Sequence, residues 1–145
     1  MLNIKIKKLS EKAIPLKYQT EGSAGMDISA CLDYPVTLKS FERTIIPTGF
    51  AMSIPLGYAG FIYARSGLAV KEGVTLPNCV GIIDSDYRGE VKVAVVNLSS
   101  LPVTINHGDR IAQLVITKTE SVSFTETDEL DNTERADGGF GSTGI

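Results

Sequence analysis

Three acidic residues crowd a short loop near the middle of the chain, between two apolar stretches. Asp84, Asp86 and Glu90 are separated only by a tyrosine, an arginine and small residues. A turn needs one Asp or Gly, so three carboxylates exceed what the turn requires. Crowded carboxylates at the end of an apolar strand are typical of a site in which one of them serves as a base. The alternative is a solvated loop whose charges face water, because structural ion clusters are also common.

A second candidate lies where an expected strand meets the one expected helix. Arg65, Ser66 and Gly67 would place a guanidinium, a hydroxyl and free backbone N–H groups together, a combination that suits phosphate oxygens. The segment lacks the G-K-[ST] of a Walker loop. The alternative is an ordinary helix cap with a surface arginine. The helix is expected over Ser66–Glu72, with Ser66 as N-cap and Gly73 as the C′ residue.

Further polar residues each allow two interpretations. Asn78, after Pro77, is either a turn residue or a carboxamide that reads the donor and acceptor edge of a pyrimidine base. Tyr87 either covers the acidic loop or stacks on a sugar. Gln113 interrupts an otherwise apolar strand, so its side chain needs a partner from the protein or from a ligand. Arg110, on the same strand, is expected first of all to pair with a nearby carboxylate.

Composition limits the classes of function. The chain has 145 residues, enough for one domain with a real core. A net charge of −3 argues against a broad nucleic-acid-binding face, although local arginines could still hold a small anion. The isolated Cys31 and Cys79, with a single histidine, cannot furnish a standard zinc set and do not suggest a secreted disulfide scaffold. The alternating N-terminus resembles neither a signal peptide nor a membrane span, which predicts a cytoplasmic protein.

Short strand-like segments separated by turn residues dominate the chain. Their spacing predicts an all-β sandwich, jelly roll or barrel with the one short helix. The stretches that flank the acidic loop, Cys79–Ile83 and Glu90–Leu98, predict a β-hairpin. A loop is expected over Gly22–Asp27. The other expected strands are Leu2–Lys7, Val36–Lys39, Thr44–Ile54, Tyr58–Ala64, Val103–Asn106, Arg110–Ile116 and Ser121–Thr125.

The composition changes after Thr125. Residues 126–145 contain six acidic residues and four glycines, and Leu130 and Ile145 are their only aliphatic side chains larger than alanine. Such a segment cannot bury enough surface to order itself. It nevertheless carries Arg135 and Phe140, followed by Gly-Ser-Thr-Gly. We therefore expect a flexible tail that closes over a ligand, with the ring stacking and the arginine, hydroxyls and amides holding an anion.

Five segments, taken together and in order, resemble the five motifs of the homotrimeric dUTP pyrophosphatases (dUTPases). Each motif alone is weak, but the set is specific and spans residues 24–144. The departures are mild: Ile28 stands where leucine is usual, Ala64 where glycine often precedes the arginine, and Ala136 where glycine often follows the tail arginine. None of them removes a group that does chemistry. The segments are Ala24–Ala30, Ala64–Ala69, Gly81–Gly89, Arg110–Leu114 and Arg135–Gly144.

The resemblance implies a jelly-roll-like β domain over residues 1–125, which holds a nucleotide site, and a flexible glycine-rich tail over residues 126–145. It implies a homotrimer with shared sites, in which one subunit supplies phosphate-binding residues, a second supplies the uracil-binding hairpin around the acidic loop, and a third supplies the tail. The implied reaction is hydrolysis of dUTP to dUMP and pyrophosphate, which keeps uracil out of DNA and supplies dUMP for thymidylate synthesis. The implied cofactor is Mg²⁺, carried by substrate phosphates and water without a direct protein ligand.

The resemblance also assigns roles to the residues that match the family's motifs. Asp84 would orient and deprotonate the water that attacks the α-phosphorus. Tyr87 would pack flat on the deoxyribose and exclude a 2′-hydroxyl. The uracil edge would be read by Asn78 and by backbone groups of Ile82, Ile83 and Lys92.

The phosphates would be held from two places, the main domain and the tail. Asp27 would support the site by hydrogen bonds or through metal-bound water, and Arg110 would also support it. Phe140 would stack over the uracil. The residues implied to contact phosphate oxygens are Arg65, Ser66, Gly67 and Gln113 in the domain, and Arg135, Gly141, Ser142 and Thr143 in the tail.

Two other functions remain as alternatives. A dCTP deaminase would share the β core but would release ammonia rather than pyrophosphate. A non-enzymatic β-sandwich module would bind a nucleotide or a protein without turnover. The glycine-rich tail and the acidic loop at residues 84–87 favour the dUTPase interpretation.

Overall fold

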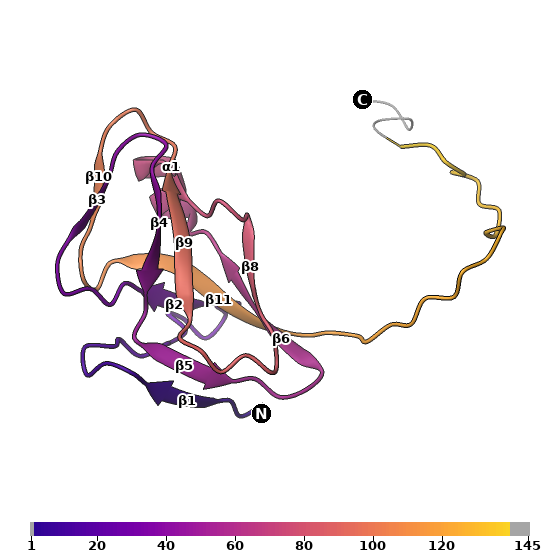
Figure 1. Cartoon of the computed structure of the whole chain (residues 1–145), viewed down its shortest axis with the longest axis horizontal. Helices are drawn as coiled ribbons and strands as arrows, with labels where there is room; N and C mark the ends of the chain where they lie inside the picture. Colours follow the sequence, from indigo (N-terminus) through magenta and orange to yellow (C-terminus); the bar gives the residue numbers. More distant parts are fainter. Residues whose placement is uncertain (1, 140–145) are drawn as a thin grey trace.

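The computed structural model describes residues 2–139 as a β domain of eleven strands with one short helix, followed by a segment that leads away from it (Figure 1). The predicted all-β class and single short helix are confirmed. Within residues 2–139, no helix is long and apolar enough to cross a membrane. The elements are β1 (Lys5–Lys8), β2 (Met26–Ser29), β3 (Val36–Leu38), β4 (Arg43–Pro47), β5 (Phe50–Ser53), β6 (Tyr58–Tyr63), α1 (Ser66–Glu72), β7 (Val74–Thr75), β8 (Val80–Ile83), β9 (Lys92–Asn97), β10 (Val103–Ile105) and β11 (Arg110–Lys118).

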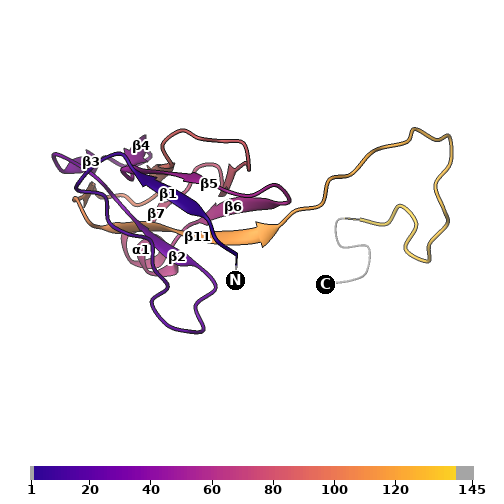
Figure 2. The ribbon, with the colours of Figure 1, turned by 90° about the horizontal axis from the view of Figure 1, so that it is seen from below.

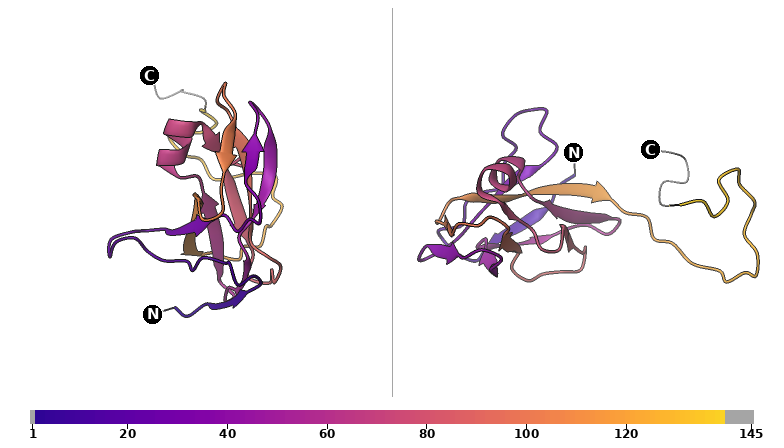
Figure 3. Two further views of the ribbon diagram at one scale, coloured as in Figure 1. Left: turned by 90° about the vertical axis from the view of Figure 1, so that its left-hand side faces the viewer. Right: turned by 90° about the horizontal axis from the view of Figure 1, so that it is seen from above.

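Two antiparallel sheets enclose most of the core. The larger has the strand order β2-β11-β6-β8 and the smaller has the order β4-β9-β7, while β1–β5 and β10–β3 form two-stranded sheets. Ile62 and Leu114 from the larger sheet and Val93 and Val95 from the smaller one belong to one buried cluster. The helix α1 lies at one side of these sheets (Figure 3). This arrangement is the jelly-roll-like β domain that the family resemblance implies, and it is one of the architectures that the spacing of the strands allows.

The two strands that flank the acidic loop do not pair with each other, so the predicted hairpin is wrong. β8 pairs with β6, from Gly60↔Ile83 to Tyr63↔Val80, whereas β9 pairs with β4 and β7. The apolar pattern identified both strands, but a pattern does not say which sheet a strand joins. Residues 84–91 therefore cross from one sheet to the other, and the neighbouring edges of β8 and β9 are not hydrogen-bonded to each other.

The predicted strand Thr44–Ile54 is two strands, β4 and β5, separated by a turn at Gly49. Gly49 has a φ of +75°, a conformation that favours glycine. A Cβ at this position would lie 2.8 Å from Cys31 Sγ and 2.9 Å from the Ala13 Cβ. The turn lets β5 pair with β1 while β4 pairs with β9. The apolar residues are in fact interrupted here by Pro-Thr-Gly at 47–49, a turn signal that the single predicted strand overlooked.

Smaller differences concern the ends of elements. The expected loop Gly22–Asp27 is wrong at its end, because β2 begins at Met26 and pairs with β11. The helix has the predicted bounds and ends at Gly73 with φ +72°, but its N-cap is Arg65, without a side-chain capping hydrogen bond. Strand β7 was not expected, because two residues are too few to show a period.

Residues 119–139 follow β11 and run away from the β domain (Figure 2). The N–H of Thr119 donates to the Gly57 carbonyl at 3.0 Å, at the point where the segment leaves the domain. Phe124 and Leu130 are 94% and 84% exposed. The predicted strand Ser121–Thr125 is wrong in the described chain, because a strand needs a partner edge and none within residues 2–139 pairs with it.

Candidate active site

A polar cavity of about 280 Å³ lies where the start of α1 meets strands β2 and β11. The register of the larger sheet explains its composition, because Gln113 is opposite Asp27 on one side and Tyr63 on the other. Segments far apart in the sequence are thereby placed side by side. The residues that line the cavity are Gln19, Ser23, Ala24, Gly25, Asp27, Arg65, Ser66, Gly67 and Gln113.

Asp27 holds two arginine side chains in place, Arg65 in the wall of this cavity and Arg110 next to it. Its Oδ1 accepts a hydrogen bond from Arg65 Nε at 2.9 Å, and its Oδ2 accepts one from Arg110 Nη1 at 3.1 Å. Arg65 Nη1 also donates to the Arg110 carbonyl at 3.2 Å. The Asp27 side chain is only 13% exposed, so the pairs are partly shielded from solvent. A guanidinium fixed in this way is pre-organised for a phosphate oxygen.

The remaining residues of the polar cavity are small or carry polar side-chain atoms. Ser66 and Gly67 form the first turn of α1, and a Cβ on Gly67 would meet no atom within 4 Å, which leaves open space there. Gln113 Nε2 donates to the Ala64 carbonyl at 3.2 Å, so the protein supplies one partner for this carboxamide. A Cβ on Gly25 would lie 3.0 Å from Gln113 Oε1, so a side chain there would crowd the carboxamide.

A second cavity, a groove of about 310 Å³, lies between β8 and β9. The absence of pairing between these strands leaves room for it. Every residue of the main domain that is expected to contact the uracil or the sugar lines this groove, together with Asp84, the expected general base. Its lining residues are Ile45, Ile62, Asn78, Gly81, Ile82, Ile83, Asp84, Tyr87, Glu90, Val91, Lys92 and Ala94.

The acidic loop has a defined shape at one end of this groove. Tyr87 OH donates to the Glu90 carbonyl at 3.0 Å, and Arg88 Nη1 donates to the carbonyls of Ser85 and Tyr87 at 2.6 and 2.8 Å. A Cβ on Gly89 would lie 2.5 Å from Tyr87 OH, so the ring closely approaches this glycine. Arg88 is therefore directed at the loop's own carbonyls, and Asp84 is exposed beside the groove.

The polar cavity and the groove have no lining residue in common. One chain therefore groups the expected phosphate residues in one place and the expected base and sugar residues in another. Arg135 lines neither of these cavities, and its Nε donates to the Gly138 carbonyl at 2.9 Å within the exposed tail. The expected tail residues Phe140, Gly141, Ser142 and Thr143 lie outside the described residues.

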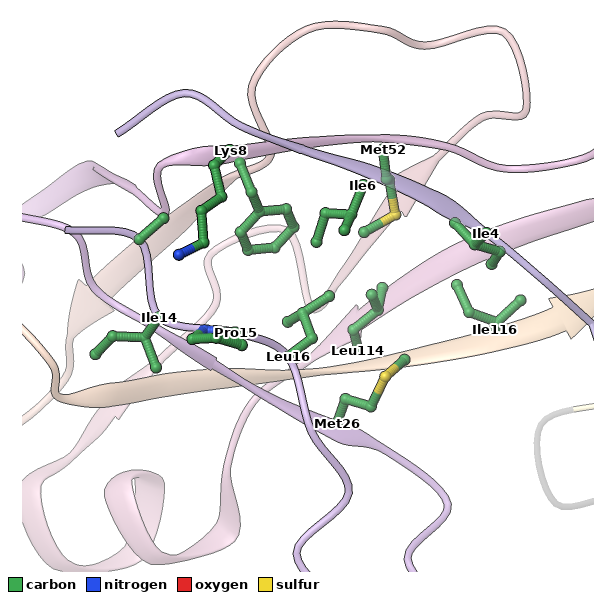
Figure 4. Close-up of a pocket in the computed structure, with 12 residues that line it drawn as sticks. Ile4, Ile6, Lys8, Ile14, Pro15, Leu16, Met26, Met52, Leu114 and Ile116 are labelled. Carbon is green, nitrogen blue, oxygen red and sulfur yellow. The ribbon is translucent and has the colours of Figure 1, made fainter. Parts of the chain in front are cut away.

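A third cavity, of about 240 Å³, lies beneath β1 and is almost wholly apolar (Figure 4). Ile6, Met26, Met52 and Leu114 point into it from four strands, and Lys8 is its only charged lining residue. It offers no set of groups for hydrolysis.

Near the β4–β5 turn, a hydrogen bond from Lys12 lowers the pKa of the exposed Asp33. Lys12 and Asp33 line neither the polar cavity nor the groove.

Proteins of one known family are similar to this chain over most of its length. The family model for dUTPase matches residues 11–144. The chain belongs to the dUTPase family. Among the dUTPases, the deoxyuridine 5′-triphosphate nucleotidohydrolase of Finegoldia magna is 54% identical over 143 residues, which is 99% of each chain. That of Fusobacterium nucleatum is 50% identical over 145 residues, again 99% of each chain.

Solved dUTPase structures show the same fold. The Staphylococcus bacteriophage 80alpha dUTPase with dUPNHPP has a TM-score of 0.91 and 27% identity, covering 100% of both chains. A variant dUTPase from phage phi11 of S. aureus, described with a coordinated structural Mg(II) ion, has a TM-score of 0.82 and 25% identity, covering 90% of this chain and 100% of that one. Within residues 2–139 of the present dUTPase, no group of three or more His, Cys, Asp or Glu side chains is arranged to hold a metal.

The structure adds lining residues that the sequence patterns did not single out. Gln19 and Ser23 reach the polar cavity from the loop before β2, and Ser23 Oγ accepts a hydrogen bond from Thr20 N–H at 3.1 Å. Ile45 and Ala94 line the groove because they are register partners on β4 and β9. Apolar residues on a strand are expected to face the core, and nothing in the sequence distinguishes one that lines a groove instead.

Proposed function

We propose that this dUTPase hydrolyses dUTP to dUMP and pyrophosphate, with the uracil in the groove between β8 and β9 and Asp84 as the base. The observation that carries the proposal is the composition of that groove. It places a carboxamide, the unpaired edge of β8, the first residues of β9 and a carboxylate around one space large enough for a pyrimidine nucleoside. The names of the relatives, and the dUPNHPP bound to the phage enzyme, agree with this substrate.

Uracil is recognised by backbone and carboxamide groups rather than by charges. Asn78 offers both a donor and an acceptor, and the β8 edge at Ile82 and Ile83 offers alternating backbone N–H and C=O groups, joined by the backbone of Lys92. Because the β8 backbone would lie directly against the uracil, no room remains for the methyl group of thymine. Cytosine would present a donor to a donor, and an unpaired buried polar group costs about 1–3 kcal/mol.

The sugar and the attacking water lie beside the acidic loop. The Tyr87 ring packs on the deoxyribose, and close contact there excludes a 2′-hydroxyl. Asp84, at the end of β8, orients a water molecule and removes its proton as the oxygen attacks the α-phosphorus. Pyrophosphate then leaves. A positioned general base of this kind contributes about 10²–10⁴-fold to the rate.

The polar cavity holds the triphosphate. Arg65 provides a guanidinium fixed by Asp27, and the backbone of Ser66 and Gly67 provides N–H groups at the start of α1, with Gln113 at the cavity wall. Charge neutralisation and positioning are the main requirements for attack on a phosphoric anhydride. Asp27 and Arg110 are therefore positioning residues, because they orient Arg65.

Mg²⁺ fits this site as a companion of the substrate. Both oxygens of Asp27 already accept hydrogen bonds from arginines, and the described residues form no carboxylate cage. This donor set suits a cation that keeps its waters and is held by phosphate oxygens. When bound, Mg²⁺ would neutralise negative charge on the triphosphate. The residues of this chain supply the arginine contacts, the shape of the cavity and the base.

The lack of a common lining residue supports sites that are shared between subunits, and the subunit number that the family resemblance implies is three. A single triphosphate nucleotide must contact both sets of residues, and one chain holds them in cavities without a common lining residue. We assign the polar cavity to one subunit, the groove to a second and the tail to a third. The tail would bring Arg135 and residues 140–143 over the bound nucleotide, exclude bulk water and complete the anion clamp.

Mixed trimers provide a direct test of shared sites. Asp84→Asn and Arg65→Ala subunits are each expected to be inactive alone, because each removes one half of every site. When the two are unfolded together and refolded, sites that combine an intact groove with an intact polar cavity should recover a fraction of wild-type activity. Pyrophosphate release measures the recovery. If the mixture stays as inactive as its components, while refolded wild type is active, each site belongs to one subunit.

Pyrophosphate release from four nucleotides tests the proposed reaction. With Mg²⁺ present, we expect turnover of dUTP and at least roughly 10²-fold lower kcat/KM for dTTP, dCTP and UTP, since each meets a clash or an unpaired polar group. Release of ammonia from dCTP would instead identify a deaminase. Intact dUTP after prolonged incubation would identify a binding module without turnover.

A further inference from the structure

Glu90 makes three contacts that the proposed chemistry does not use. Its Oε1 accepts a hydrogen bond from Gly49 N–H at 2.9 Å, and its Oε2 lies 3.6 Å from Lys92 Nζ. Its backbone carbonyl accepts the hydrogen bond from Tyr87 OH at 3.0 Å. The side chain is 23% exposed, so these contacts are partly shielded. One residue thus joins the β4–β5 turn, the start of β9 and the tyrosine of the nucleotide groove.

The turn to which Glu90 is attached is rigid. Gly49 has a φ of +75°, and atoms of Cys31 and Ala13 occupy the space next to its α-carbon. Its carbonyl accepts hydrogen bonds from the N–H groups of Leu9 and Ser10 at 2.8 and 3.2 Å. Gly49 is therefore held by packing on one side and by hydrogen bonds on another, and it can serve as a fixed point for the loop.

The same turn also holds the residue after Glu90. Val91 N–H donates to the Phe50 carbonyl at 2.9 Å, and the Val91 carbonyl accepts a hydrogen bond from the buried Thr48 hydroxyl. The hydrogen bond from Gly49 N–H to the Glu90 carboxylate attaches the neighbouring residue to the same turn. The backbone carbonyl of Glu90 in turn accepts the hydrogen bond from Tyr87 OH. Because the tyrosine ring also lies against Gly89, its position depends on the backbone at residues 89 and 90.

We propose that Glu90 is a positioning residue that sets the place of the Tyr87 ring and thereby the discrimination between deoxyribose and ribose. It acts through Tyr87 rather than on the reacting atoms. This inference rests on the proposed function, because it assumes that Tyr87 packs on the sugar. The side-chain hydrogen bond to Gly49 matters more than the charge, since Lys92 Nζ is 3.6 Å away and 52% exposed, where an ion pair is weak.

Three substitutions separate the reach of the side chain from its charge. Glu90→Gln keeps the length and an oxygen acceptor for Gly49 N–H but loses the charge. Glu90→Asp keeps the charge but is one methylene too short, and Glu90→Ala loses both. We expect the ratio of kcat/KM for dUTP over UTP to fall roughly tenfold in the Asp and Ala variants and to stay within about twofold of wild type in the Gln variant.

The outcomes separate positioning from a purely structural role. Loss of stability alone would lower the amount of active enzyme for both nucleotides and leave the ratio unchanged, so an unchanged ratio in Glu90→Asp and Glu90→Ala overturns the proposal. If Glu90→Ala does not fold, the comparison of the Asp and Gln variants decides. Wild-type enzyme that releases no pyrophosphate from dUTP would overturn the proposed function itself, a result distinct from an active wild type with unaltered variants.

Discussion

Asp84→Asn should still bind dUTP but lose about 10²–10⁴-fold in kcat, the usual contribution of a positioned general base. The amide has the shape of the carboxylate and can still hold a water molecule, but it cannot take the proton. Affinity should not weaken, because the change removes a negative charge near the triphosphate. Pyrophosphate release gives kcat, and calorimetry with a non-hydrolysable dUTP mimic gives Kd.

Asp86→Asn is the matched control for this substitution. Asp86 lies in the same exposed loop but does not line the groove, so neutralising it removes the same charge without touching the site. Its kcat should remain within about threefold of wild type. If Asp84→Asn hydrolyses dUTP at an undiminished rate, Asp84 is not the base. Equal losses in both variants would point to the net charge of the loop as the cause.

Removal of residues 134–145 should leave a folded protein with an unchanged number of subunits that has lost at least about 10²-fold in kcat/KM, the usual effect of removing anion-stabilising donors. The described part of the tail supports the first half of this expectation, because nearly all of its residues are exposed and Arg135, among residues 2–139, hydrogen-bonds only to the nearby Gly138. The loss of activity follows from losing an arginine, an aromatic ring and two hydroxyls that the proposal places over the nucleotide.

Glu134→Gln in the full-length chain provides the control for the truncation. It changes one charge at the boundary of the deleted segment and keeps every proposed ligand contact, so its activity should match wild type. Thermal melting and light scattering report on folding and assembly. A truncated protein that unfolds would show that the tail is structural, and one that retains full activity would show that closure of the tail is not needed.

The sequence identified most strands and singled out residues that line one groove, for physical reasons that particular positions make plain. Val93 and Val95 alternate with less buried neighbours, so β9 could be read from its period. Gly73 ends α1 in the left-handed conformation that its residue type predicted. The grouping of Asn78 with Asp84 follows from their proximity along one strand and its ends.

Long-range partners could not be read in the same way. The pattern around the acidic loop was compatible with a hairpin, and only the tertiary fold shows that β8 joins β6 while β9 joins β4. The hydrogen bond between Gly49 and Glu90 joins residues 41 positions apart. The turn at Gly49 is a different case, because Pro-Thr-Gly at 47–49 is a turn signal in the sequence, although it does not show that β4 and β5 pair with different strands.

A structure of the assembled enzyme with a non-hydrolysable dUTP mimic and Mg²⁺ tests the central claim most directly. The uracil should lie between β8 and β9 beside Asn78, with Asp84 within one water molecule of the α-phosphorus and the phosphates against Arg65 of a neighbouring subunit. A nucleobase bound outside that groove, or an α-phosphorus remote from Asp84, would contradict the proposed site.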